Sequence, residues 1–210
     1  MSQVNNPLFA RLLVLMHRYE SAEEAEHRGE ALAGLSGRVL DVGAGDGANF
    51  AHFPAAVTEV VAVEPEPYLR EHARRRASEA PVPVRVIDAV AERLPLEDGS
   101  IDAAVVSLVL CTVPDPEAAL RELRRVLRAG GELRFYEHVV AHEPRLARAQ
   151  RLLQRSRIWP MLAGGCHPAR DTAAAIEAAG FGIERCRRVT VRPNMLAAPV
   201  APRILGTARR

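Results

Sequence analysis

The chain has 210 residues, of which 28 are basic and 26 acidic, and every basic residue is an arginine because the sequence contains no lysine. Without lysine, P-loop nucleotide hydrolases and enzymes that form a lysine Schiff base are excluded. Hydrophobic residues make up 48% of the chain, enough for the core of one domain. A net charge of +2 over this length gives no basic stripe for nucleic acid.

The first 36 residues predict an N-terminal helical extension that could act as a lid over a ligand. Its apolar run from Leu8 to Met16 is interrupted by Arg11 and is too short to span a membrane. No cleavage site of a signal peptide follows the run. We therefore expect a cytoplasmic protein with no membrane partner and no nucleic-acid partner.

From residue 37 onward, strand-like and helix-like stretches alternate. Strands are predicted at 38–42, 57–63, 82–87, 101–110, 132–140, 181–192 and 203–208, and helices at 48–53, 68–79, 114–127, 145–157 and 171–179. This order is typical of an α/β fold, and we expect residues 37–210 to form a single domain. The domain is predicted to be a Rossmann-like, doubly wound sheet of seven strands with helices on both faces.

A glycine-rich turn gives the strongest chemical signal, Asp41-Val42-Gly43-Ala44-Gly45-Asp46-Gly47 after the first strand. Its backbone N–H groups, with the start of the following helix, are expected to bind an anion such as a phosphate or a carboxylate. Glu64 ends the second strand, where a carboxylate accepts hydrogen bonds from ribose hydroxyls. A dinucleotide fingerprint also fits the glycines, but Asp41 would repel a pyrophosphate and suits a cationic amine.

Residues 38–139 resemble the class I S-adenosylmethionine-dependent methyltransferases, through the stretches RVLDVGAGDG, VVAVEP, AERLPLEDGSIDAAVV and RRVLRAGGELRFYEH. The stretches SLVLCTVPDPEAALRELRRVLRAGGELRFYEHV, LAGGCHPARDT and IEAAGF are similar to the alkyl thiol methyltransferase-like family and its bacterial relatives. The mammalian members of that family carry an N-terminal membrane anchor, which we do not expect here.

The resemblance implies S-adenosyl-L-methionine as cofactor, S-adenosyl-L-homocysteine as product and a small-molecule acceptor, with a thiol sulfur favoured. Only residues 1–36 and 141–170 are left to shape an acceptor pocket, which also favours a small molecule. Oxygen, nitrogen or carbon acceptors remain alternatives within this class. An NAD-dependent oxidoreductase and a cofactor-binding protein without catalysis are alternatives from other classes.

The resemblance also implies a set of cofactor-binding residues. The methionine part is expected on the glycine turn with an acidic residue behind it, the ribose at the end of the second strand, adenine after the third strand and the methionine arm after the fourth. In that order the residues are Asp41, Gly43, Ala44, Gly45 and Gly47; Glu64 and Pro65; Val90, Ala91 and Glu92; and Ser107, Leu108 and Val109. Many relatives carry an aspartate at the position of Val90.

Three residues are catalytic candidates. His138 follows the fifth strand at the open end of the sheet and is predicted to be a base or to orient the acceptor, with Glu137 as its partner or as a cap of local backbone. His167 either faces the substrate from a loop or begins the next helix. Cys111 and Cys166 are interpreted as small buried hydrophobic residues, and the wide spacing of the cysteines predicts no metal site.

Overall fold

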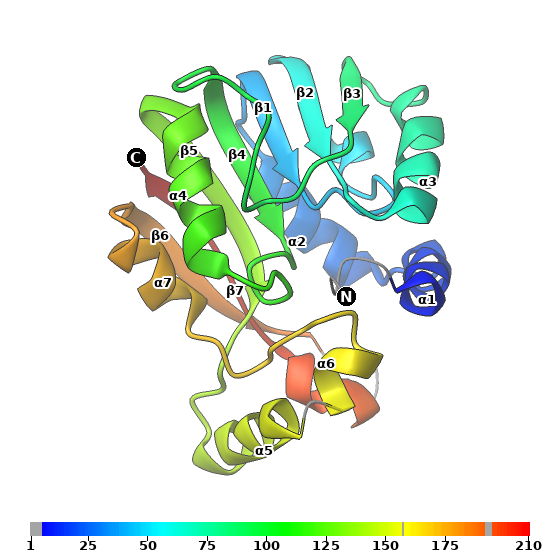
Figure 1. Cartoon of the computed structure of the whole chain (residues 1–210), viewed down its shortest axis with the longest axis vertical. Coiled ribbons are helices and arrows are strands. Elements are labelled where there is room, and N and C mark those ends of the chain that lie inside the picture. The colour runs from blue at the N-terminus through cyan, green and yellow to red at the C-terminus, as the bar shows by residue number, and fades with distance from the viewer. Residues whose placement is uncertain (1–5, 157, 192–194) are drawn as a thin grey trace.

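The computed structural model describes residues 6–156, 158–191 and 195–210. These residues form a seven-stranded sheet in the order β3-β2-β1-β4-β5-β7-β6 (Figure 1). The strands are β1 (Gly37–Val42), β2 (Val57–Val63), β3 (Val84–Ile87), β4 (Ile101–Ser107), β5 (Leu127–His138), β6 (Gly182–Thr190) and β7 (Pro202–Arg209). Strands β1 to β5 are parallel, and β7 runs antiparallel to both of its neighbours. The predicted seven-stranded, doubly wound α/β sheet is confirmed.

The two faces of the sheet are each covered by helices because side chains alternate along the buried strands. In β1, Leu40 and Val42 belong to one apolar core, and Val39 belongs to the other. The first core is completed by α4 (Pro116–Val126) and α7 (Thr172–Ala178), and the second by α2 (Ala22–Leu32) and α3 (Pro67–Ala77). Each helix therefore buries an apolar stripe against the sheet.

The chain reverses its direction of travel across the sheet at β1. It passes from β1 outward to β2 and β3 and then returns to β4 on the other side of β1. In such sheets the crevice beyond the carboxyl ends of the strands at this switch point is where ligands bind. Beyond these ends lie α5 (Pro144–Arg155) and α6 (Ile158–Leu162), while α1 (Pro7–Arg18) lies beside α3 (Figure 1).

One predicted helix is wrong. Residues 48–53 form turns and the short 3-10 helix η1 (Phe50–His52) in place of an α-helix. Gly45 and Gly47 precede this segment and Pro54 follows it, so there is room for only about one turn. The predictions also lacked α6 and a second 3-10 helix, η2 (Met195–Val200), and the predicted strand 181–192 extends into residues outside the described ranges.

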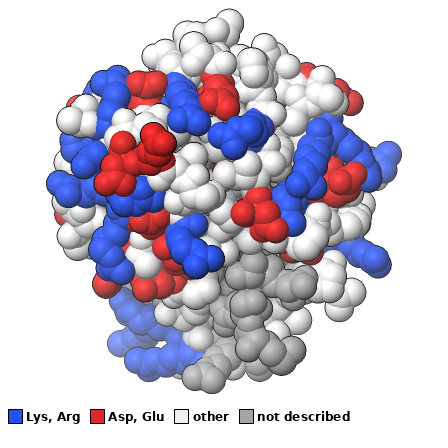
Figure 2. Space-filling model, turned by 45° about the horizontal axis from the view of Figure 1, so that its top comes forward, with Lys and Arg blue, Asp and Glu red and all other residues white. Residues whose placement is uncertain are grey.

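Charges are mixed on the face of the molecule shown in Figure 2, where arginines lie among acidic side chains over most of the surface. The described residues of this face form no continuous basic track for a nucleic-acid backbone. In the part of the chain that the structure describes, no helix is both long and apolar enough to cross a membrane.

Candidate active site

A cavity of about 670 Å³ lies at the switch point of the sheet. It is lined by the glycine turn after β1, by the segments that follow β2, β3, β4 and β5, and by residues of α1 and α2. Of the residues predicted to form the site, those on the cavity wall are Gly43, Ala44, Gly45, Glu64, Pro65, Val90, Ala91, Glu92, Ser107, Leu108, Val109 and His138. The structure therefore brings twelve predicted residues together around one space.

The glycine turn is shaped by close packing. Gly43 and Gly47 both have positive φ, which only glycine adopts without strain. A Cβ on Gly43 would lie 2.7 Å from Val109 Cγ2, and one on Gly47 would lie 2.7 Å from the ring of Phe50. Gly43 therefore lets the segment after β4 approach the turn, whereas Gly47 packs on η1 and does not line the cavity.

Three N–H groups of the turn are already used within the protein. Ala44 donates to the carbonyl of Val63, Gly47 donates to the carbonyl of Ala44, and Gly45 donates to the Glu64 carboxylate at 2.9 Å. No α-helix starts at the turn either, so the predicted cradle of N–H groups with a helix dipole is wrong in form. Fewer N–H groups of the turn are therefore left for a ligand anion at this end of the cavity.

Arg28 is a buried cation on the cavity wall, and it was not predicted from the sequence. Its guanidinium lines the cavity, forms a 2.7 Å ion pair with Glu20 and donates to Asn49 Oδ1 at 2.8 Å. Asn49 in turn donates to Asp41 Oδ1 at 2.8 Å. Asp41 is fully buried behind the turn and reaches the cavity only through Asn49. Burial raises the pKa of Asp41 to about 7.

Glu64 is a buried carboxylate whose two oxygens can each accept a further hydrogen bond. Its Oε1 accepts from the N–H of Glu66 at 2.8 Å, and its Oε2 accepts from the N–H of Gly45. Each carboxylate oxygen has about two acceptor positions, so one per oxygen is left for hydroxyl donors in the cavity. Burial raises the pKa of Glu64 to about 7, against the lowering effect of both N–H bonds.

The segment after β4 is held from two sides. Glu137, with no exposed surface, accepts hydrogen bonds from the N–H groups of Val109, Leu110 and Cys111 at 2.8, 2.9 and 3.1 Å. Arg170 donates to two carbonyls of the same segment, those of Leu110 and Val113. Glu137 thus acts as the cap foreseen as one of its two roles, and burial raises its pKa.

Backbone strain is concentrated at the start of the same segment. Leu108 has a φ of 61°, the only positive φ among the described non-glycine residues. Such a conformation costs about 1 kcal/mol or more, and the surrounding hydrogen bonds hold it in place. Ser107, Leu108 and Val109 thereby face the cavity opposite the glycine turn.

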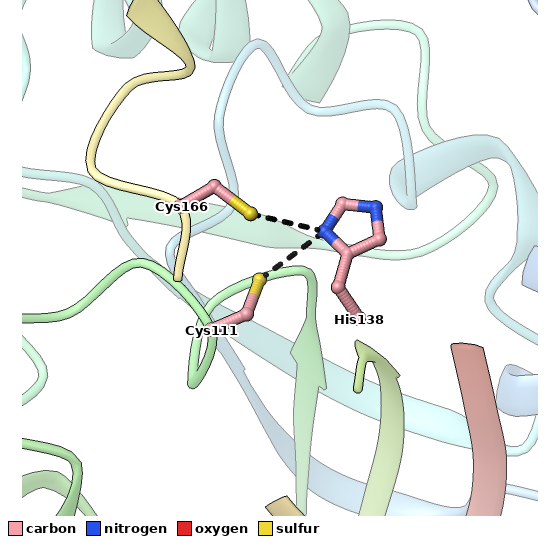
Figure 3. Close-up of side chains that lie close together, drawn as sticks. All are labelled: Cys111, His138 and Cys166. Atoms are coloured by element: carbon pink, nitrogen blue, oxygen red, sulfur yellow. Dashed lines mark hydrogen bonds between the residues drawn. The ribbon is translucent and has the colours of Figure 1, made fainter. Parts of the chain in front are cut away.

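His138 lies at the inner wall of the cavity with two cysteines (Figure 3). Its Nδ1 is 3.4 Å from Cys111 Sγ and 3.5 Å from Cys166 Sγ. Burial raises the pKa of Cys111, and the hydrogen bond with Cys111 lowers the pKa of Cys166. Both cysteines are buried as expected, but their convergence on one imidazole was not predicted.

His167 points elsewhere. Its side chain lines a second hollow between the start of α1 and α6, and not the cavity at the switch point. Its backbone N–H donates to the carbonyl of Cys111 at 2.7 Å. The segment around His167 therefore supports the group formed by Cys111, His138 and Cys166, which we call the cysteine cluster. Burial lowers the pKa of the His167 imidazole.

The outer wall of the cavity is formed by α1. His17 Nδ1 lies 2.6 Å from Asp46 Oδ1, and Arg76 pairs with the other oxygen at 3.0 Å, which joins α1 to the glycine turn. Burial opposes ionisation of Asp46, but these partners hold its pKa below the ordinary value. Tyr19 is 76% exposed and lies at the cavity rim.

Comparison with known proteins agrees with this geometry. A family described as a methyltransferase domain matches residues 40–135. The thiol S-methyltransferase TMT1B of Mus musculus is 38% identical over 183 residues, which cover 84% of this chain and 73% of that protein. The chain belongs to the class I S-adenosylmethionine-dependent methyltransferase family that includes TMT1B. This membership decides against the NAD-dependent and non-catalytic alternatives.

Solved structures share the fold of this methyltransferase. A geranyl diphosphate methyltransferase in complex with S-adenosylmethionine has a TM-score of 0.68 at 19% identity and covers 96% of this chain and 90% of its own. A methyltransferase of Thermotoga maritima, described as a possible histamine N-methyltransferase, has a TM-score of 0.67 at 24% identity. The match covers 96% of this chain and 97% of that protein. Both matches show that the fold is shared over nearly the whole chain.

The residues of this chain fit the family's cofactor. The cavity volume lies within the range of about 300–1,000 Å³ that is usual for small-molecule sites. Glu64 offers two acceptor oxygens to a pair of hydroxyls, and the Arg28 guanidinium offers a buried cation to a carboxylate. These are the complementary groups that the ribose and the amino-acid end of S-adenosylmethionine require.

Proposed function

We propose that this methyltransferase transfers the methyl group of S-adenosylmethionine to the sulfur of a small thiol. The observation that carries the proposal is the 38% identity to a thiol S-methyltransferase over 84% of the chain. The cavity supports it, because its inner wall carries the imidazole of His138 and the thiol of Cys166. The limited volume of the cavity favours a small acceptor over a macromolecule.

Each part of the cofactor has a proposed partner in the cavity. Glu64 accepts from the two ribose hydroxyls, and Arg28 pairs with the amino-acid carboxylate. Adenine lies against the wall formed by Val90, Ala91 and Glu92, all three of which line the cavity. Ser107, Leu108 and Val109 flank the methionine arm. Asp41 acts indirectly by fixing Asn49, and through it Arg28.

When bound, S-adenosylmethionine supplies an electrophilic methyl group on a sulfonium, so the leaving group needs no acid. The chain's contribution is therefore positioning of the acceptor, exclusion of water and removal of the acceptor's proton. A thiol needs less help with ionisation than a hydroxyl, because its ordinary pKa is about 8.5. His138 lies on the wall where it can assist at the acceptor sulfur.

The two segments outside the sheet are proposed to complete the site. Residues 1–36 form a lid, since α1 lines the cavity and is joined to the glycine turn through His17 and Asp46. Residues 141–170 shape the acceptor end, since Ala163, Gly164 and Cys166 line it. Two buried free cysteines are compatible with a reducing compartment, and we propose a cytoplasmic location.

The acceptor is tested by incubating purified protein with methyl-labelled S-adenosylmethionine and matched thiols, phenols and amines. The proposal expects label in thioether products and an equal amount of S-adenosylhomocysteine. Turnover of phenols or amines with no turnover of any thiol would refute the sulfur acceptor and favour oxygen or nitrogen methylation.

A further inference from the structure

Three potential metal ligands converge at the inner wall of the cavity. Cys111 comes from the segment after β4, His138 from the end of β5, and Cys166 from the segment between α6 and α7, and Figure 3 shows their side chains pointing toward one another. The two sulfurs and the imidazole nitrogen all lie within 4.8 Å of one another. Among the described residues this is the one group of three or more histidine, cysteine or acidic side chains so arranged.

The two sulfur–nitrogen separations match the edges of a zinc tetrahedron. With Zn–S about 2.3 Å, Zn–N about 2.0 Å and an angle of about 109°, the distance between a sulfur and the nitrogen is about 3.5 Å. The two observed distances to His138 Nδ1 are 3.4 and 3.5 Å. An imidazole nitrogen has one lone pair and accepts from only one thiol at a time, whereas a shared metal ion would bind all three atoms at once.

The surrounding backbone fixes the three ligands before any ion binds. Glu137 accepts from the N–H of Cys111, and the Cys111 carbonyl accepts from the N–H of His167, which is adjacent to Cys166. Gly165 has a φ of 91°, and a Cβ there would lie 3.0 Å from the Thr112 carbonyl oxygen. This glycine therefore allows the close approach that brings Cys166 to Cys111.

We propose that Cys111, His138 and Cys166 bind a zinc ion, whose fourth position faces the cavity and takes the sulfur of the acceptor thiol. Two thiolates and one imidazole with an open position form the ligand set of catalytic rather than structural zinc sites. His138 and Cys166 line the cavity, and Cys111 is buried behind them, so the open position is on the acceptor side. The role of the fourth position rests on the thiol methyltransferase function proposed above.

The proposed methyl transfer requires no oxidant or reductant. The acceptor thiol displaces a zinc-bound water and loses its proton to solvent, which leaves a zinc-bound thiolate. An electron pair of that sulfur forms the new S–C bond to the methyl group, while the electrons of the donor's C–S bond return to the donor sulfur. The products are a thioether and S-adenosylhomocysteine, and water returns to the zinc. His138 is a metal ligand in this scheme and not a proton acceptor.

Metal binding is tested on the whole protein by zinc analysis and by cobalt spectroscopy. Protein produced with added zinc and dialysed against a weak chelator should retain about one zinc per chain. Replacement by Co²⁺ should give thiolate-to-cobalt charge transfer and the intense visible bands of a four-coordinate site. Addition of a simple thiol to the cobalt protein should shift these bands, and addition of the matching alcohol should not.

Variants separate a built site from adventitious binding. Cys111→Ser and Cys166→Ser should each lose the retained zinc and the charge-transfer band, whereas Cys186→Ser, which changes an exposed cysteine on β6, should keep both. Circular dichroism and thermal unfolding show whether the two losses occur in folded protein. If either variant does not fold, the cobalt spectra of the wild-type protein and of the His138→Gln variant are compared. The wild-type protein should show the charge-transfer band, and the variant should have lost or shifted it.

Three outcomes would overturn the proposal. First, the wild-type protein could retain no zinc and give no cobalt spectrum. Second, the three cysteine variants could retain equal amounts of metal. Third, Cys111 and Cys166 could form a disulfide in protein prepared under reducing conditions. Zinc retention with no turnover of thiols would refute the proposed acceptor and leave the metal site standing. Thiol turnover by zinc-free protein would refute the metal site and leave the proposed function standing.

Discussion

Replacing Glu64 by glutamine should weaken cofactor binding by roughly a hundredfold. In the wild type, each carboxylate oxygen accepts one backbone N–H and keeps one acceptor position for a ribose hydroxyl. The amide keeps one oxygen and replaces the other by a donor, so one hydroxyl bond is lost and the other is no longer charge-assisted. Together these changes cost about 3 kcal/mol, which is roughly a hundredfold in Kd.

The assay is isothermal titration with S-adenosylhomocysteine, which has the same ribose and carries no reactive methyl group. Glu59→Gln is the matched control, because Glu59 lies on β2, the strand that leads to Glu64, but pairs with Arg38 and Arg85 away from the cavity. The control should bind as the wild type does. A Glu64→Gln protein that folds and binds within about fivefold of the control would refute the assignment of the ribose to Glu64.

Three further predictions concern the same cavity. Arg28→Gln should raise the Kd of S-adenosylhomocysteine by roughly tenfold or more. The Kd of 5′-methylthioadenosine, which lacks the carboxylate, should stay nearly unchanged. An equal loss of affinity for both ligands in these titrations would contradict the pairing of Arg28 with the carboxylate. Because burial raises the pKa of Glu64 to about 7 in the free protein and the ribose favours the ionised form, the affinity should rise with pH up to about 7 and then level off. Titrations from about pH 5.5 to 8.5 check this, and a flat wild-type profile, or a Glu64→Gln profile as steep as that of the wild type, would be inconsistent with it. His17→Ala should release α1 from Asp46, which would raise the Kd about fivefold and speed amide exchange in residues 7–18; unchanged exchange would argue against a lid.

The sheet and much of the cavity wall were predictable because they depend on local patterns. Apolar β-branched runs bounded by glycine and proline gave all seven strands, and the order of elements placed the site at their carboxyl ends. Glu64 could be placed beside the glycine turn because it directly follows the second strand, which ends at the same edge of the sheet. The prediction of a helix at 48–53 was wrong because it relied on the alternation of strands and helices along the chain. The glycines before this segment and Pro54 after it leave room for only a short 3-10 helix.

The remaining parts of the site depend on contacts that sequence spacing does not encode. Arg28 sits in a charged helix where an arginine usually faces solvent, and only the tertiary structure buries it against Asn49. The three residues of the cysteine cluster are separated by 27 and 28 positions and come from different segments, so no metal-binding motif is visible. His167 was predicted to face the substrate from a loop, but it lines the second hollow and not the cavity at the switch point.

Methyl transfer to a thiol sulfur can be tested directly by a single-turnover experiment. The protein is loaded with one equivalent of S-adenosylmethionine carrying a trideuterated methyl group and mixed with an aromatic thiol or with the phenol of the same shape. We expect the thiol to take up the intact trideuteromethyl group on sulfur, with one S-adenosylhomocysteine formed per chain, and the phenol to react far more slowly. Transfer to the phenol at the same rate, or no transfer to the thiol from a fully loaded protein, would contradict it.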